Sequence, residues 1–233
     1  MPTANDVLYC AKQWLSYSRW TDPEPGSVFG RWYAKMVGDP YFGTSGVPYC
    51  AMFVSYCLDW AGVSAEGMPG AYVPWILSAN SEAGRLVANE DAQPGDLVMF
   101  DWQGDGVADH IGIVAENHPD EGWMQTIEGN TSPGTSGSQS NGGGVYRRAR
   151  SYGSIIGVAR PYYTEEEDML TEHQDRLLAT IFEQVTGTYD PTGRGVELCD
   201  HDHIKYIGKA VADNAAAIQA VDAKLDKLIE KLG

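Results

Sequence analysis

Residues 49–62, with the sequence YCAMFVSYCLDWAG, place the strongest constraint on what this chain can fold into. Apolar side chains recur at helical spacing along this segment and form one face of a helix. They are Phe53, Val54, Cys57, Leu58 and Ala61. Pro48 disfavours helix before it, and Gly62 is a typical C-terminal stop. The segment is therefore predicted to be a helix that buries one face.

The two cysteines of this helix occupy different environments. Cys50 lies where a loop enters the helix, where free backbone N–H groups and the positive end of the helix dipole favour a thiolate. Cys57 lies two turns further on, within the apolar face. We expect Cys50 to be reactive and Cys57 to be packed.

Composition and charge exclude several classes of protein. The 233 residues fit one domain of about 150 residues and an additional segment. A formal charge of −16 argues against a nucleic-acid partner and disfavours binding to anionic lipid. No apolar run approaches the length of about 20 residues that a membrane helix needs, so no membrane insertion is expected. The first residues lack a basic region followed by an apolar core, and no signal peptide is expected.

The hydrophobic period changes along the chain from helical to strand-like near residue 92. Predicted helices cover residues 5–17, 32–37, 49–62 and 73–83, the first of them capped by Asn5 or Asp6. Predicted strands cover residues 97–100, 110–115, 123–128, 145–150 and 155–160. The connections between these strands are too short for crossover helices, so the sheet should be mainly antiparallel. Helices followed by strands predict an α+β fold.

Composition changes again after residue 162, and residues 163–233 are predicted to form a separate α-helical region. It comprises a helix over residues 164–185, a Gly/Pro linker over 186–202, and a heptad repeat over 204–232 with one polar seam residue, Asn214. The strict 3.5-residue period favours a coiled coil that makes a homo-oligomer through residues 203–232. A single amphipathic helix docked on its own domain is the alternative.

A thiol hydrolase needs a nucleophilic thiolate, an imidazole that accepts and returns its proton, and a polar group that orients the imidazole. Cys50 is the candidate nucleophile, and His110, at the start of a predicted strand, is the candidate base. If this strand pairs antiparallel with the next, Glu128 comes to lie beside His110 and can orient it. Asn130, two residues later, is a second candidate for that role.

Four sequence blocks then resemble the CHAP domain family in their order and content. They are PYCAMFV at residues 48–54, PGDLV at 94–98, DHIGIV at 109–114 and IEGN at 127–130. The resemblance covers residues 1–162 and implies a papain-like domain in which N-terminal helices pack on an antiparallel sheet. It implies a cysteine peptidase or amidase, with Cys50 as nucleophile, His110 as base, Glu128 as orienter and Asn130 as a supporting polar residue.

The same resemblance implies bacterial peptidoglycan as the substrate. Either an N-acetylmuramoyl-L-alanine amidase or a stem-peptide or cross-bridge endopeptidase fits, because both attack an amide with the same groups. We expect an antimicrobial bacteriophage endolysin for cell lysis, made in the host cytoplasm and released to the cell wall through a holin pore. The alternatives are a virion-associated or transglutaminase-like thiol enzyme, and a non-lytic wall-binding module that self-associates. One departure from the family is Tyr49, which stands where many members have Gln, so the oxyanion donors beyond the Cys50 backbone N–H stay open.

Two segments carry residues that can bind metals. Asp101, Asp105 and Asp109 partly match a calcium loop, but Gln103 stands where Asp or Asn is expected and no Glu occupies the twelfth position. A polar turn that presents His110 is the favoured interpretation. Residues 199–203 (CDHDH) contain soft ligands, but a hydrophilic helix entry is favoured over a zinc site. We expect no metal and no cofactor.

Overall fold

The computed structural model describes residues 2–134 and 137–163, all of which belong to one compact unit, Met1–Thr164. The predictions for residues 164–233, including the linker and the heptad repeat, lie outside the described residues. No helix in the described part of the chain is long and apolar enough to cross a membrane.

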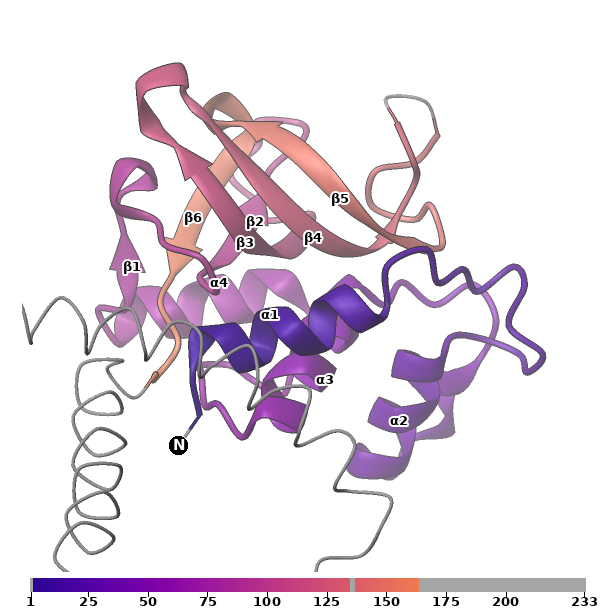
Figure 1. Ribbon diagram of the computed structural model, residues 1–233. Helices are drawn as coiled ribbons and strands as arrows, with labels where there is room; N and C mark the ends of the chain where they lie inside the picture. Colours follow the sequence, from indigo (N-terminus) through magenta and orange to yellow (C-terminus); the bar gives the residue numbers. More distant parts are fainter. Residues whose placement is uncertain (1, 135–136, 164–233) are drawn as a thin grey trace, which may run out of the picture. The chain divides into compact units, whose positions relative to one another are not determined.

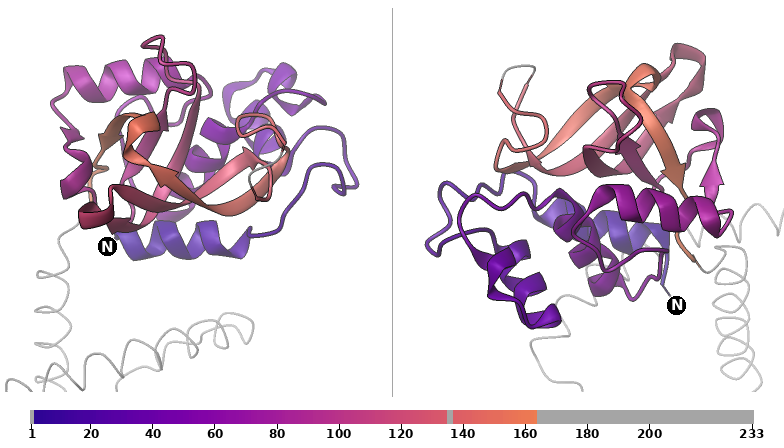
Figure 2. Two further views of the ribbon diagram at one scale, coloured as in Figure 1. Left: turned by 90° about the horizontal axis from the view of Figure 1, so that it is seen from above. Right: turned by 180° about the vertical axis from the view of Figure 1, so that it is seen from behind.

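A helical layer packs against one face of a six-stranded antiparallel sheet (Figures 1 and 2). The helices are α1 (Ala4–Gln13), α2 (Val28–Val37), α3 (Cys50–Ala61) and α4 (Val73–Glu82). The strands are β1 (Leu86–Val87), β2 (Leu97–Phe100), β3 (His110–His118), β4 (Trp123–Thr131), β5 (Gly144–Ser151) and β6 (Ile155–Ala159). Their order in the sheet is β1-β6-β2-β3-β4-β5, and short 3₁₀ turns occupy Pro40–Gly43, Asn89–Asp91, Pro119–Glu121 and Tyr152–Ser154. The α+β prediction and the antiparallel sheet are confirmed.

Helix α3 lies at the centre of the domain, because it packs against α1, α2, β3 and β4. Its residues 51–54 are almost completely buried. The main core joins the helices to the sheet face that carries Leu97, Ile111, Ile113 and Ile127. A smaller cluster on the other face includes Val98, Phe100, Val114, Met124 and Val158. Strand β2 is consequently buried on both sides, as its continuous apolar run predicts.

The first helix differs from its prediction at both ends. Thr3, and not Asn5 or Asp6, is the N-cap: its hydroxyl accepts from Asp6 N–H, and the Asp6 carboxylate accepts from Thr3 N–H, which makes a capping box. The helix ends at Gln13 and does not reach residue 17. Beyond Ser16, which has a φ of 72°, the chain turns and pairs with the start of β5. Long-range strand pairing therefore overrides the local helical period.

The bounds of other helices and strands also differ from their predictions. Helix α2 begins at Val28, four residues earlier than predicted, because the Ser27 hydroxyl caps it by accepting from Gly30 N–H. Strands β3 and β4 form a hairpin that extends to His118 and Thr131, beyond the apolar residues that the prediction followed. Backbone pairing holds polar residues in these extensions. Strand β1 was missed, since two residues carry no period.

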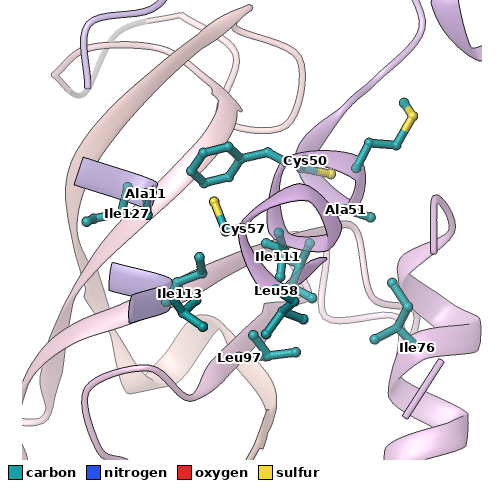
Figure 3. Packing of buried hydrophobic residues seen from close by; sticks show 14 of the residues in the cluster. Ala11, Cys50, Ala51, Cys57, Leu58, Ile76, Leu97, Ile111, Ile113 and Ile127 are labelled. Atoms are coloured by element: carbon teal, nitrogen blue, oxygen red, sulfur yellow. The ribbon is translucent and has the colours of Figure 1, made fainter. Parts of the chain in front are cut away.

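Cys57 is completely buried, and Figure 3 shows it among side chains of the main core, while Cys50 lies at the end of the same helix. Burial raises the pKa of Cys57 well above its usual value. The packed role predicted for Cys57 is confirmed.

We predict that Cys57→Ala lowers the free energy of unfolding by about 1 kcal/mol, the usual cost of removing one buried heavy atom. Chemical denaturation of the full chain measures this change. The matched variant Cys50→Ala, at the first residue of the helix and 5% exposed, should cost less. Equal stability of Cys57→Ala and the natural chain would contradict the assigned packing.

Candidate functional site

Cys50 is the first residue of α3, and no side chain makes a capping hydrogen bond at this end of the helix. The N-cap is Tyr49, whose side chain makes no capping hydrogen bond. The first hydrogen bond of the helix runs from Phe53 N–H to Tyr49 O at 2.8 Å. The N–H groups of the first three helical residues, Cys50 among them, therefore have no partner within the helix. Such an end stabilises negative charge placed next to it.

Tyr49 is held inside the domain, away from solvent. Its ring stacks on Phe29 with 5.5 Å between the centroids, and its hydroxyl donates to Gly143 O at 2.7 Å. The residue that departs from the common family pattern thus anchors the start of α3 to the segment before β5. Its hydroxyl proton is already used.

The turn over residues 101–109 presents His110 at the start of β3. The Asp101 carboxylate accepts from four backbone N–H groups at 2.6–3.3 Å. These bonds, the one from Gly106 first, lower the pKa of Asp101. Asp109 accepts from Trp102 N–H at 2.7 Å, and Asp105 accepts from Val107 N–H at 3.0 Å. The three carboxylates thus organise the loop as a polar turn, and residues 2–134 and 137–163 contain no group of three or more His, Cys, Asp or Glu side chains placed to hold a metal ion.

His110 and Glu128 form a completely buried pair. The Nε2 atom of His110 lies 3.0 Å from Oε2 of Glu128, as antiparallel pairing of β3 and β4 predicts. Gly112 makes room for the carboxylate, because a Cβ at this position would lie 2.7 Å from Cγ of Glu128. The other ring nitrogen, Nδ1, is buried and has no nitrogen or oxygen partner. This leaves Nδ1 for the Cys50 thiol, which interacts with the ring.

The surroundings keep both members of the pair charged. Burial lowers the pKa of His110, but the Cys50 thiol and the Glu128 carboxylate favour the charged ring and raise the pKa to about 9. Burial raises the pKa of Glu128, but hydrogen bonds from Arg150 and His110 outweigh it and bring the pKa to about 2. At neutral pH the site therefore contains an imidazolium next to a carboxylate.

Arg150 is the residue that sequence reasoning missed. From β5 it donates two hydrogen bonds to Glu128, from Nε to Oε1 at 2.7 Å and from Nη2 to Oε2 at 2.5 Å. Thr126 adds a third bond, from its hydroxyl to Oε1 of Glu128 at 2.6 Å. The alternation of Thr126 with Glu128 places both on one face of β4, a signal that the sequence contains. Choosing Arg150 over Arg147 and Arg148 required the side-chain contacts of the folded domain, because the β4–β5 register pairs Arg148 with Thr126 and Arg150 with Met124.

Asn130 lies in a different position from the other three candidates. It has a φ of 62° in an irregular part of β4, where the pairing register with β5 shifts. Its Nδ2 atom donates to Ser140 O at 2.7 Å, while its backbone carbonyl accepts from Gly142 N–H at 2.8 Å. The structure thus brings Cys50, His110 and Glu128 together, and it places the Asn130 amide against the segment before β5.

A thiol at an uncapped helix start, a buried imidazole and a buried carboxylate are the groups that amide hydrolysis by a cysteine needs. The helical layer and the antiparallel sheet form a papain-like fold, and these three side chains are its candidate site. Residues 41–130 match the CHAP domain, and this part of the chain belongs to the CHAP domain family. That family consists of cysteine amidohydrolases and peptidases.

Comparison with individual proteins yields more distant relatives. The chain is 28% identical over 104 residues to the uncharacterized protein YhbB of Bacillus subtilis (strain 168), which covers 35% of this chain and 33% of that protein. The chain therefore spans about a third of that relative. A crystal structure of an NlpC/P60 family protein from Bacillus cereus ATCC 10987 has a TM-score of 0.39 and 18% identity, covering 70% of this chain and 41% of the other. The crystal structure of Ly7917 has a TM-score of 0.39 and 13% identity, covering 68% and 62%.

We predict that His110 titrates with a midpoint near pH 9 in NMR spectra of the full chain. In Glu128→Gln the midpoint should fall, because the carboxylate that favours the charged ring is lost while burial still favours the neutral ring. Since the folded pKa lies above the usual value of about 6.5, the charged ring contributes stability that is present below about pH 6.5 and lost as the pH rises through about 9.

Glu121→Gln is the matched control, because Glu121 bonds to the Trp123 indole on the distant hairpin. It should leave the His110 titration unchanged. A His110 midpoint at or below about 6.5 in the natural chain would contradict the charged pair.

Proposed function

We propose that this chain hydrolyses an amide bond of bacterial peptidoglycan, with Cys50 as the nucleophile, His110 as the general base and acid, and Glu128 as the group that orients His110. The observation that carries the proposal is the buried pair of His110 and Glu128 next to the thiol at the start of α3. Membership of the CHAP domain family supports it.

The reaction starts from the way in which His110 is held. Glu128 accepts a hydrogen bond from Nε2, so Nδ1 is the nitrogen that exchanges a proton with Cys50. The Cys50 sulfur attacks the amide carbonyl carbon, and the C=O double bond becomes a C–O⁻ single bond. Free N–H groups at the start of α3 stabilise that oxyanion, since they carry no partner within the helix. The Tyr49 hydroxyl takes no part, because it already donates to Gly143 O.

The second half of the reaction regenerates the thiol. His110 gives its proton to the leaving amine, the C–N bond breaks, and a thioester remains on Cys50. A water molecule then loses a proton to His110 and attacks the thioester, which releases the carboxylic acid. An N-acetylmuramoyl-L-alanine amidase and a stem-peptide or cross-bridge endopeptidase both use these steps and differ only in the amide they accept.

The biological setting of the proposal is cell lysis by a bacteriophage endolysin that reaches the wall through a holin pore. The chain is strongly acidic, so a single copy should bind an anionic wall weakly. Self-association through residues 203–232 would raise avidity without any new contact. Those residues lie outside the part of the chain that the structure describes.

We predict that Cys50→Ser abolishes digestion of purified peptidoglycan while circular dichroism shows an unchanged fold. The hydroxyl is a far weaker nucleophile than the thiol at neutral pH. Mass spectrometry of the fragments from the natural chain separates the two reactions: a new free N-terminal L-Ala identifies an amidase, and a cut inside the peptide identifies an endopeptidase.

Cys57→Ala serves as the matched control and should digest the wall at the natural rate when it is folded. Digestion by folded Cys50→Ser at the natural rate would overturn the mechanism. A natural chain that leaves peptidoglycan intact yet cleaves another amide would overturn only the choice of substrate.

We further predict a graded loss at the two partners of Cys50. His110→Ala removes the base and the acid together and should lower kcat by about 10²–10⁴-fold. Glu128→Gln only disturbs the orientation of the ring, so activity should be reduced but measurable. Full activity of Glu128→Gln would assign the orienting role to another residue, and the rates of Asn130→Ala and Asp109→Asn would then identify it.

A further inference from the structure

We propose that Arg150 is a positioning residue that holds Glu128 as a hydrogen-bond acceptor and thereby keeps the His110 ring positively charged beside the Cys50 sulfur. This inference rests on the proposed function, since it names a further residue of the same site. Arg150 lies on β5, outside the region that matches the family, and it acts on the reaction only through Glu128 and His110.

The contact between Arg150 and Glu128 has the geometry of a two-point clamp. Nε and Nη2 of Arg150 each donate to a different oxygen of the carboxylate, at 2.7 and 2.5 Å. Paired bonds of this kind fix the plane of a carboxylate as well as its position. Oε2, which receives the Nη2 bond, is also the oxygen next to His110 Nε2. The clamp therefore fixes the position of the carboxylate oxygen that accepts from Nε2 of His110.

Aromatic rings cover the clamp and the imidazole together. The guanidinium carbon of Arg150 lies 4.8 Å from the centroid of the Trp102 ring and 5.6 Å from that of Phe100. Trp102 and Phe100 stack on each other, and both lie about 6 Å from the His110 ring. Arg150 itself is 7% exposed. A guanidinium enclosed in this way is placed to hold Glu128, and it is poorly placed to contact a substrate.

The chemical consequence concerns the charge of the His110 ring. Without Arg150, the buried Glu128 carboxylate would keep the imidazolium as its charged partner and the Thr126 hydroxyl as a neutral donor. Transfer of the Nε2 proton to Glu128 would make both groups of the pair neutral. The neutral carboxylic acid would then donate to Nε2, and the remaining ring proton would lie on Nδ1. In that state Nδ1 still carries a proton toward Cys50, but the ring has lost the positive charge that favours a thiolate at Cys50.

The charged or titratable groups that face Glu128 are His110 and Arg150, with Arg148 acting at longer range. Arg148 donates to Gln139 at 2.9 Å and makes no hydrogen bond to the carboxylate. Arg150 is therefore the group that opposes proton transfer to Glu128. Lys at position 150 would keep the charge but lose the two-point geometry.

The test uses a double-mutant cycle in the full chain, with Arg150→Met, Glu128→Gln and the double variant. The first readout is the rate at which iodoacetamide alkylates Cys50 between pH 5 and 9 (a test range chosen around the usual titration of His), located by mass spectrometry of the Cys50 peptide. Arg150→Met should slow alkylation at pH 7 about tenfold, the effect of one pKa unit, and Arg150→Lys should fall between. In the Glu128→Gln background, Arg150→Met should change the rate less than about twofold, since coupled residues lose their interaction only once.

The second readout is independent of catalysis. Nitrogen-15 NMR of the His110 ring at pH 7 should show both nitrogens protonated in the natural chain, and a neutral ring with its proton on Nδ1 in Arg150→Met. Arg147→Gln is the matched control on the same strand, because Arg147 is exposed and bonds only Gln125 among the described residues. It should match the natural chain in both readouts.

Identical ring protonation in the natural chain and Arg150→Met would overturn the proposal, as would full additivity in the cycle. If Arg150→Met does not fold, the same comparison with Arg150→Lys decides the matter. Failure of the proposed function has a different signature: digestion of peptidoglycan would survive Cys50→Ser while the ring still responded to Arg150.

Discussion

The site depends on a buried line of alternating charges that runs from Arg150 through Glu128 to His110. Isolated charges are costly inside a protein, so each member is tolerable only because the next one compensates it. The two-point clamp by Arg150 offsets the burial of Glu128, and Glu128 in turn supports the charged His110 ring. The thiol of Cys50 stands at the end of this line. Its environment is thus determined by a strand, β5, that lies beyond the region matched to the family.

The helical layer and the sheet bring two unlike elements to the same point. Helix α3 contributes Cys50 and unpaired N–H groups at its uncapped start, while its buried side chains attach it to the core. The sheet contributes rigidly paired strands, which carry His110 and Glu128 on one face. The turn at residues 101–109 adds Trp102 over both His110 and Arg150. Hydrogen bonds from the loop backbone to the Asp101 carboxylate hold this polar turn, and they thereby give Trp102 a defined position.

Tyr49 and Asn130 lie near the site and hold the surrounding backbone in place through hydrogen bonds. The Tyr49 hydroxyl donates to Gly143 O, and the Asn130 side chain donates to Ser140 O, while the Asn130 backbone carbonyl accepts from Gly142 N–H. Both side chains thereby attach the segment before β5 to the start of α3 and to the end of β4. That segment leads directly into the strand that carries Arg150. The polar contacts around the loop therefore hold the start of the strand that carries the clamp.

The sequence by itself determined the α+β class, the position of Cys50 at a helix start, the burial of Cys57 and the approach of Glu128 to His110. These follow from local periods and from short connections, which leave antiparallel pairing as the available geometry. Only the tertiary structure decided the end of α1, where pairing with β5 overrides the helical period, and the choice of Arg150 among three arginines of one strand. The first outcome depends on the register between segments far apart in the chain. The second depends on side-chain contacts, because the β4–β5 register places Arg148 nearer to Glu128 than Arg150. Register is set by the combined packing of the sheet, so no local pattern in either segment specifies it.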